Sequence, residues 1–160
     1  MEKQQNHHGL LIAAAIFLGI GLAGLFDGVV LHKILQWHHM LSSVRPPTDA
    51  ASIKLNDLWD SIFLAGTYTV IVVGIILLLV ASQRGNILDS LKIFGGCLAI
   101  GAGSFNVIEG LIDHHILGIH HVKSGANELA WDLGFLAINA ALVALGWIIL
   151  RAEVRDVKTS

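Results

Sequence analysis

Residues 27–39 of this chain read DGVVLHKILQWHH, and residues 109–121 read EGLIDHHILGIHH. An acid, a glycine and three histidines occur in the same order and at the same spacing in both stretches, which we call the first and the second motif. Each motif is followed by a further similarity, because NDLWD at 56–60 resembles NELAWD at 127–132. Hydrophobic packing alone does not require such agreement between polar residues. We therefore expect a tandem duplication whose most faithfully repeated residues are potential metal ligands.

The composition is that of a membrane protein. The 160 residues are strongly apolar and poor in charge, and their mean hydropathy is clearly positive. Four stretches each offer the ~20 mostly apolar residues that a spanning helix needs, at 10–31, 59–81, 91–112 and 129–150. A chain this small cannot bury four such helices on every side, so we expect contact with the lipid bilayer. The small negative net charge argues against a nucleic-acid partner.

The predicted fold is an all-α integral membrane four-helix bundle in one domain, residues 1–160. Two helical hairpins build it, related by a pseudo-twofold axis along the membrane normal. The first repeat spans 10–81, with helices at about 10–41 and 55–81, and the second spans 91–151, with helices at about 91–122 and 126–151. The lysines and arginines modestly favour cytoplasmic N- and C-termini, which places the histidines on the outer side of a plasma membrane.

Helical geometry selects one set of candidate ligands. At ~1.5 Å rise per residue, Asp27 and His38 lie roughly 16 Å apart along a continuous helix, too far to bind one ion. His32 and His39 lie about 10 Å apart, and Asp60 is expected at the level between them. The same reasoning applies to the second motif. The predicted metal ligands are His32, His39, Asp60, His114, His121 and Asp132.

A second set of polar residues is expected to support these ligands or to add to them. Asp27 and Glu109 would form a deeper acidic pair, suited to ligand support or a proton relay. The full supporting set is Asp27, His38, Asn56, Asp57, Glu109, Asp113, His120 and Glu128. His115 points away from the common arc and is left out. Ionisable groups inside a membrane are costly, so this many require a compensating partner: a bound metal, or a structural network of mutual salt bridges.

The donor types limit the cofactor. Histidine and carboxylate suit zinc, iron, manganese or copper, and two three-ligand sets predict a dinuclear site or two equal sites. Haem b is the alternative, held by bis-histidine ligation through His32 and His114. The nearby carboxylates speak against haem, as does the absence of a clear arginine pair for its propionates.

The functional prediction is a multi-pass plasma-membrane metalloprotein with an outward-facing His/Asp site. If it is an enzyme, metal-assisted hydrolysis or oxidation is the expected chemistry. Bis-histidine electron transfer and non-catalytic metal handling are the alternatives. The pattern fits a chain acting alone or as a homo-oligomer, and it does not specify a substrate.

Three segments carry a family resemblance: LFDGVVLHKILQWHHM at 25–40, NVIEGLIDHH at 106–115 and GIHHV at 118–122. They resemble an uncharacterised bacterial family of multi-span membrane proteins, the DUF2243 family, catalogued only as a domain of unknown function. The resemblance covers nearly the whole chain. It implies a bacterial plasma-membrane protein with several spans, and it supplies no activity.

Overall fold

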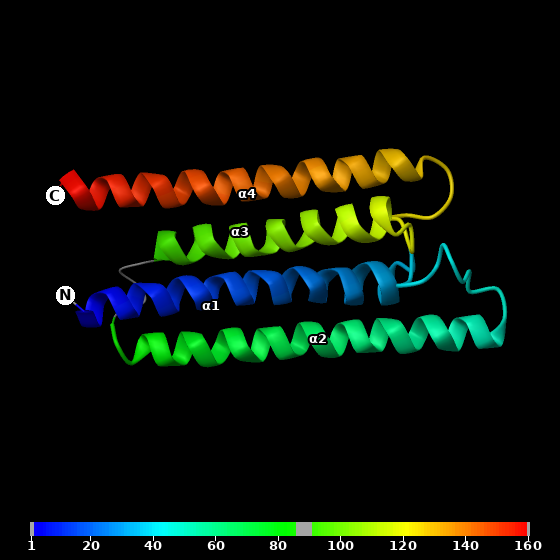
Figure 1. The fold of residues 1–160 in the computed structure, drawn as a ribbon, viewed down its shortest axis with the longest axis horizontal. Helices are drawn as coiled ribbons and strands as arrows, with labels where there is room; N and C mark the ends of the chain where they lie inside the picture. Colours follow the sequence, from blue (N-terminus) through cyan, green and yellow to red (C-terminus); the bar gives the residue numbers. More distant parts are fainter. Residues whose placement is uncertain (1, 86–90, 160) are drawn as a thin grey trace.

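The computed structural model describes residues 2–85 and 91–159, which are mainly helical (Figure 1). In chain order the elements are α1 (Glu2–Phe26), the π-helix η1 (Asp27–Ile34), α2 (Ala50–Ser82), α3 (Leu91–Glu109), the π-helix η3 (Gly110–Ile116) and α4 (Glu128–Thr159). Four helices in the described residues are long and apolar enough to cross a membrane. The prediction of an all-α membrane protein is confirmed.

The helices lie in one row, in the order α2, α1, α3, α4 (Figure 1). α1 packs against α2 and α3, and α3 packs against α4, whereas no contact joins α2 to α4 within the described residues. The predicted four-helix bundle is therefore open rather than closed. A bilayer permits this arrangement, because lipid chains cover apolar helix faces that a protein in water would have to pair with one another.

Glycines let the two central helices approach at backbone distance. A Cβ atom built on Gly19 of α1 would collide with the backbone of Leu98 and Ala102 in α3, and one on Gly101 would collide with the carbonyl of Ile16. Small residues of this kind are typical of membrane helix interfaces. The half of the α1–α3 interface nearer the chain termini is consequently apolar and closely packed.

The regular helices end earlier than the sequence predicts. η1 ends at Ile34 rather than near residue 41, and η3 ends at Ile116 rather than near residue 122. Two residues after each end, the backbone adopts a positive φ, 50° at Gln36 and 58° at Gly118. A left-handed residue at this position is a common helix terminator that reverses the chain.

Backbone hydrogen bonds hold both reversals in the same way. Trp37 N donates to Leu31 O at 3.0 Å in the first motif, and Ile119 N donates to Asp113 O at 2.9 Å in the second. In each case the amide that follows the left-handed residue donates to a carbonyl in the last helical turn. This bond is typical of a Schellman motif. As a result, the last two histidines of each motif lie in loops that fold back over the helix ends.

The close α1–α3 contact predicts the effect of adding a single methyl group. Gly19→Ala should lower the free energy of unfolding by about 1–3 kcal/mol, because the new Cβ meets backbone that cannot move aside. Gly66→Ala on α2 is the matched control: its Cβ would meet nothing within 4 Å, and alanine is the better helix former. Reversible unfolding in mixed micelles measures both. Equal stabilities for the two variants would contradict this packing.

Candidate metal centre

The π-helices bring the acid of each motif to its first histidine. The two residues are five apart in the sequence, which would separate them by roughly 140° around an α-helix. In a π-helix, residues five apart are hydrogen-bonded neighbours. His32 Nε2 therefore lies 3.0 Å from Asp27 Oδ2, and His114 Nε2 lies 3.4 Å from Glu109 Oε1.

The reversed loops add a second histidine to each acid. His38 Nε2 lies 3.7 Å from Asp27 Oδ1, and His120 Nε2 lies 2.9 Å from Glu109 Oε1. The prediction that Asp27 and His38 are too far apart to share one ion is wrong, because the helix does not continue to residue 38. Each group offers one carboxylate oxygen and two imidazole nitrogens within 4.8 Å of one another. The first triad is Asp27, His32 and His38, and the second triad is Glu109, His114 and His120.

The imidazole of His32 is oriented from behind by Asp60. Its Nδ1 lies 3.0 Å from Asp60 Oδ1, and both side chains are fully buried. An ionised carboxylate can only accept, so Nδ1 donates; when the ring is neutral, its lone pair is then on Nε2. That Nε2 is buried without a hydrogen-bond partner, as are the Nε2 atoms of His38 and His114. Such orphaned nitrogens are the feature expected of metal ligands.

The loop histidines are oriented by carbonyl groups from the other motif. His38 Nδ1 donates to Val122 O at 2.8 Å, and His120 Nδ1 donates to Met40 O at 3.2 Å. These reciprocal bonds fix each ring and join the two loops. Burial lowers the pKa of His38 to about 4, against the opposing effect of the Asp27 carboxylate. His38 is therefore neutral at pH 7, and its Nε2 presents a lone pair to the first triad.

Asp60 and Asp132, which the sequence predicts to be ligands, lie behind the triads. Asp60 accepts hydrogen bonds from His32, from His39 Nδ1 at 2.8 Å and from Met40 N at 3.0 Å. Asp132 accepts from His121 Nδ1 at 2.7 Å and from the amide of Val122 at 2.9 Å. Both carboxylates are thereby engaged with imidazole and backbone N–H groups. For Asp60, which bonds His32, this pattern is that of the outer partner in a carboxylate–histidine–metal arrangement. Asp132 lies 3.4 Å from His114 Nδ1, which makes no hydrogen bond.

The remaining predicted residues lie around the triads rather than in them. Asn56 accepts a hydrogen bond from the amide of Leu41 in the first loop. Asp57 is exposed and pairs with Lys33, and Glu128 accepts from the amide of Gly125. Asp113 is half-buried and interacts electrostatically with Asp27 and Glu109. His115 is exposed, in line with its exclusion.

Sequence reasoning missed the ion pair of Lys33 with Asp60, at 3.1 Å, and the role of the loop carbonyls as orienting acceptors. The one sequence feature that could have indicated the triads is the five-residue spacing between the acid and the first histidine, which is the same in both motifs. Backbone acceptors carry no signal in a side-chain pattern.

The two triads meet at the α1–α3 interface. The rings of His38 and His120 stack in parallel, with an interplanar angle of 1° and centroids 4.7 Å apart. His32 contacts His38 edge-on at 4.5 Å, and His114 contacts His120 in the same way at 4.9 Å. Four imidazoles therefore form one continuous cluster with a carboxylate at each side.

The spacing of the donor atoms fits a bound ion. Metal–nitrogen and metal–oxygen bonds of about 2.0–2.2 Å place neighbouring ligand atoms roughly 3–3.6 Å apart. The carboxylate–imidazole distances are 3.0 and 3.7 Å in the first triad and 3.4 and 2.9 Å in the second. Two histidines and one carboxylate suit zinc or iron.

Four membrane-length helices define a multi-span membrane protein of the all-α class, and two largely buried groups of side chains could hold metal. The chain belongs to the DUF2243 family, described as predicted membrane proteins, which matches residues 14–153. The match includes both motifs and confirms the resemblance drawn from their sequences. No curated protein and no solved structure matches the chain.

The hydrogen bonds to Asp60 predict a local effect on the first loop. Asp60→Ala should speed amide exchange over residues 37–42 about tenfold or more, because an unpaired buried donor costs about 1–3 kcal/mol. Asp57→Ala is the control, since Asp57 is exposed and bonds Lys33 rather than the loop. Hydrogen–deuterium exchange in detergent measures both variants. Unchanged exchange in Asp60→Ala would mean that Asp60 does not hold the loop.

Proposed function

We propose that this chain is a membrane metalloprotein that binds two transition-metal ions, one in each triad. The observation that carries the proposal is the set of buried Nε2 atoms that face a carboxylate without a hydrogen bond. In His32 and His38 the other ring nitrogen already donates, so when the rings are neutral both Nε2 atoms present lone pairs to the Asp27 carboxylate. A cation between them removes this repulsion, and the neutral state of His38 favours a metal ion over a proton.

The number of ligands favours catalysis. Structural metal sites are closed by four protein ligands, whereas catalytic sites have three and keep a position open for water or substrate. Two histidines and one carboxylate occur both in hydrolytic zinc sites and in non-haem Fe(II) oxygenases. We therefore propose metal-assisted hydrolysis or oxidation, with Asp60 and Asp132 fixing the ligand histidines from behind.

We further infer that the two hairpins are a duplication related by a pseudo-twofold axis along the membrane normal. A constant offset of 82 residues (109 − 27, 114 − 32 and 120 − 38) relates the members of the first triad to those of the second. The exchange of hydrogen bonds between His38 and Val122 and between His120 and Met40 is what such an axis produces. On the charge distribution, we propose that the centre faces the outside of a bacterial plasma membrane, with both termini in the cytoplasm.

The competing functions receive less support. For haem, the Nε2 atoms of His32 and His114 would have to turn from their own carboxylates toward one iron. For metal passage, the ion would have to cross the α1–α3 interface where Gly19 and Gly101 pack against backbone. A purely structural network would need a protonated His38 beside Asp27, which the burial of His38 opposes.

Neighbouring histidines distinguish the two possible ligand sets. His38→Gln should reduce the metal content from two ions per chain to one, because Nε2 of His38 belongs to the first triad. His39→Gln should retain both ions, because His39 bonds Asp60 behind the site. Metal analysis by mass spectrometry on detergent-purified protein gives the stoichiometry. Loss of an ion only in His39→Gln would restore the ligand set expected from the sequence and refute the triads.

The aspartate behind His32 should tune affinity without itself binding the metal. Asp60→Asn should weaken binding at the first triad about 10–100-fold, the usual effect of removing an outer partner of a ligand histidine. Competition with a fluorescent chelator measures the two dissociation constants separately. Only one of them should change, and a complete loss of one ion at saturating metal would instead make Asp60 a direct ligand.

A further inference from the structure

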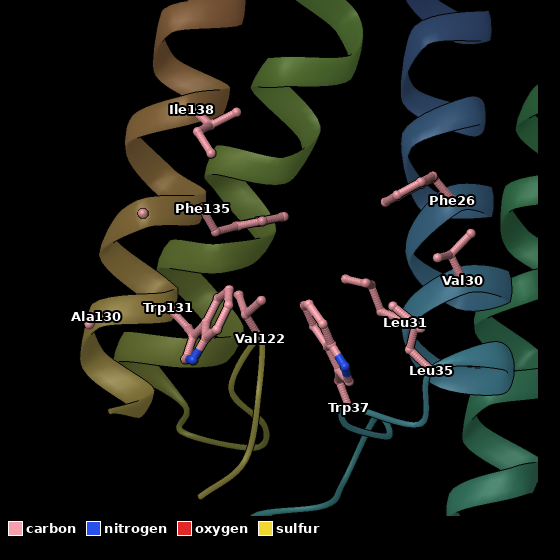
Figure 2. A pocket seen from close by; sticks show the side chains of 11 residues that line it. Phe26, Val30, Leu31, Leu35, Trp37, Val122, Ala130, Trp131, Phe135 and Ile138 are labelled. Atoms are coloured by element: carbon pink, nitrogen blue, oxygen red, sulfur yellow. The ribbon is translucent and has the colours of Figure 1, made fainter. Parts of the chain in front are cut away.

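An apolar groove lies between η1 and α4 (Figure 2). Its volume is about 470 Å³, within the range of ~300–1,000 Å³ typical of small-molecule sites. Phe26 and Leu31 line it from the first hairpin, and Trp131 and Phe135 line it from the second. α1 and α4 do not contact each other within the described residues, so the groove opens toward the surrounding lipid.

A cation stands at one end of this groove. Trp37 and Trp131 face each other in Figure 2 with ring centroids 5.3 Å apart. Lys123 Nζ lies 4.9 Å from the Trp37 ring and 5.1 Å from the Trp131 ring. The ion pairs found for lysines in the described residues belong to Lys33 and Lys92, and Lys123 pairs with no described carboxylate. Tryptophan concentrates at the headgroup level of membranes, so Lys123 is placed where lipid phosphates lie.

We propose that the groove binds one anionic phospholipid, with an acyl chain along the apolar walls and the phosphate on Lys123. Charge complementarity supports this occupant. The apolar groove matches an acyl chain, and Lys123 at its interfacial end, which pairs with no described carboxylate, matches an anionic headgroup. Two indoles hold Nζ in place by cation–π contact, so little side-chain freedom is lost when the phosphate binds.

The second motif offers no equivalent site. With the offset of 82 residues, Lys123 corresponds to Leu41 and Trp37 corresponds to Ile119. Leu31, which lines the groove, corresponds to Asp113, whose carboxylate would repel an anion. We therefore expect one bound lipid per chain rather than two.

The groove adjoins the proposed metal centre. Val122 lines it, and the carbonyl of the same residue accepts the hydrogen bond from His38. A bound lipid would thus lie beside the first triad, which makes a lipid or a similar amphiphile the substrate class to test first. That last step rests on the proposed metal function, whereas lipid binding itself does not require the metals.

Native mass spectrometry of the full chain tests the site, with dioleoyl phosphatidylglycerol and dioleoyl phosphatidylcholine as probes of equal chain length. We expect one retained phosphatidylglycerol and weaker retention of phosphatidylcholine. Lys123→Gln should weaken phosphatidylglycerol binding about fivefold, the effect of one basic residue at a membrane surface. Gly134→Leu should abolish retention, because Gly134 lines the groove and a Cβ there meets nothing within 4 Å.

Gly95→Leu is the matched control: Gly95 also has open space at its Cβ but does not line the groove, so binding should be unchanged. Binding that survives Gly134→Leu would show attraction at the surface only and would overturn the proposal. Competition by glycerol 3-phosphate, which carries no acyl chain, would also overturn the proposal. A dimer that Gly134→Leu converts to monomers would do the same.

Each measurement is repeated after chelation. Retained lipid in metal-free protein would show that this site stands even if the metal proposal fails.

Discussion

The arrangement of this protein depends on two acids, Asp27 and Glu109, placed inside membrane-length helices against imidazole nitrogens. A buried carboxylate is costly unless it is paired, and a neutral imidazole that already donates through Nδ1 cannot pair with it. In the first triad the outer contacts leave Nε2 without a hydrogen bond, because Asp60 accepts from Nδ1 of His32 and the Val122 carbonyl accepts from Nδ1 of His38. In the second triad His114 Nε2 is likewise without a partner, whereas His120 Nε2 is hydrogen-bonded to Glu109 Oε1 at 2.9 Å. The proposed cation in each triad would balance the charge of its carboxylate, and we propose that this is the reason for the polar cluster.

The backbone serves this cluster in two unusual ways. The π-helices bring an acid and a histidine five residues apart onto one side, and π-helical turns are frequently found at functional sites. A left-handed residue then turns the chain, so that the next histidine reaches the same acid from above the helix end. The close packing of α1 on α3 joins the two halves and allows each loop to orient the histidine of the other. The outer helices of the row, α2 and α4, contribute Asp60 and Asp132, and both carboxylates are buried.

Hydropathy was sufficient to predict four membrane helices, because a spanning helix must be apolar over its length. It could not predict the open row, since lipid replaces helix–helix contacts without leaving a trace in composition. Among the predicted ligands, His32 and His114 lie in the triads, whereas His39, His121, Asp60 and Asp132 lie behind them. The sequence places four other triad residues among the supporting or additional ligands: Asp27, His38, Glu109 and His120. The reason is that it predicts regular α-helices through about residues 41 and 122. Gly118 signals a left-handed turn, but Gln36 at the equivalent place does not, so the chain reversal was hidden in the first motif.

The central claim is that each triad holds a transition-metal ion, and X-ray absorption spectroscopy on metal-loaded wild-type protein tests it most directly. The account predicts two ions per chain, a first shell of nitrogen and oxygen at about 2.0–2.2 Å, and the outer-shell scattering of two imidazoles per ion. A single ion with six-coordinate porphyrin scattering would replace the paired centre with haem. Protein that binds no transition metal under loading conditions would reduce the cluster to a structural network and contradict the account.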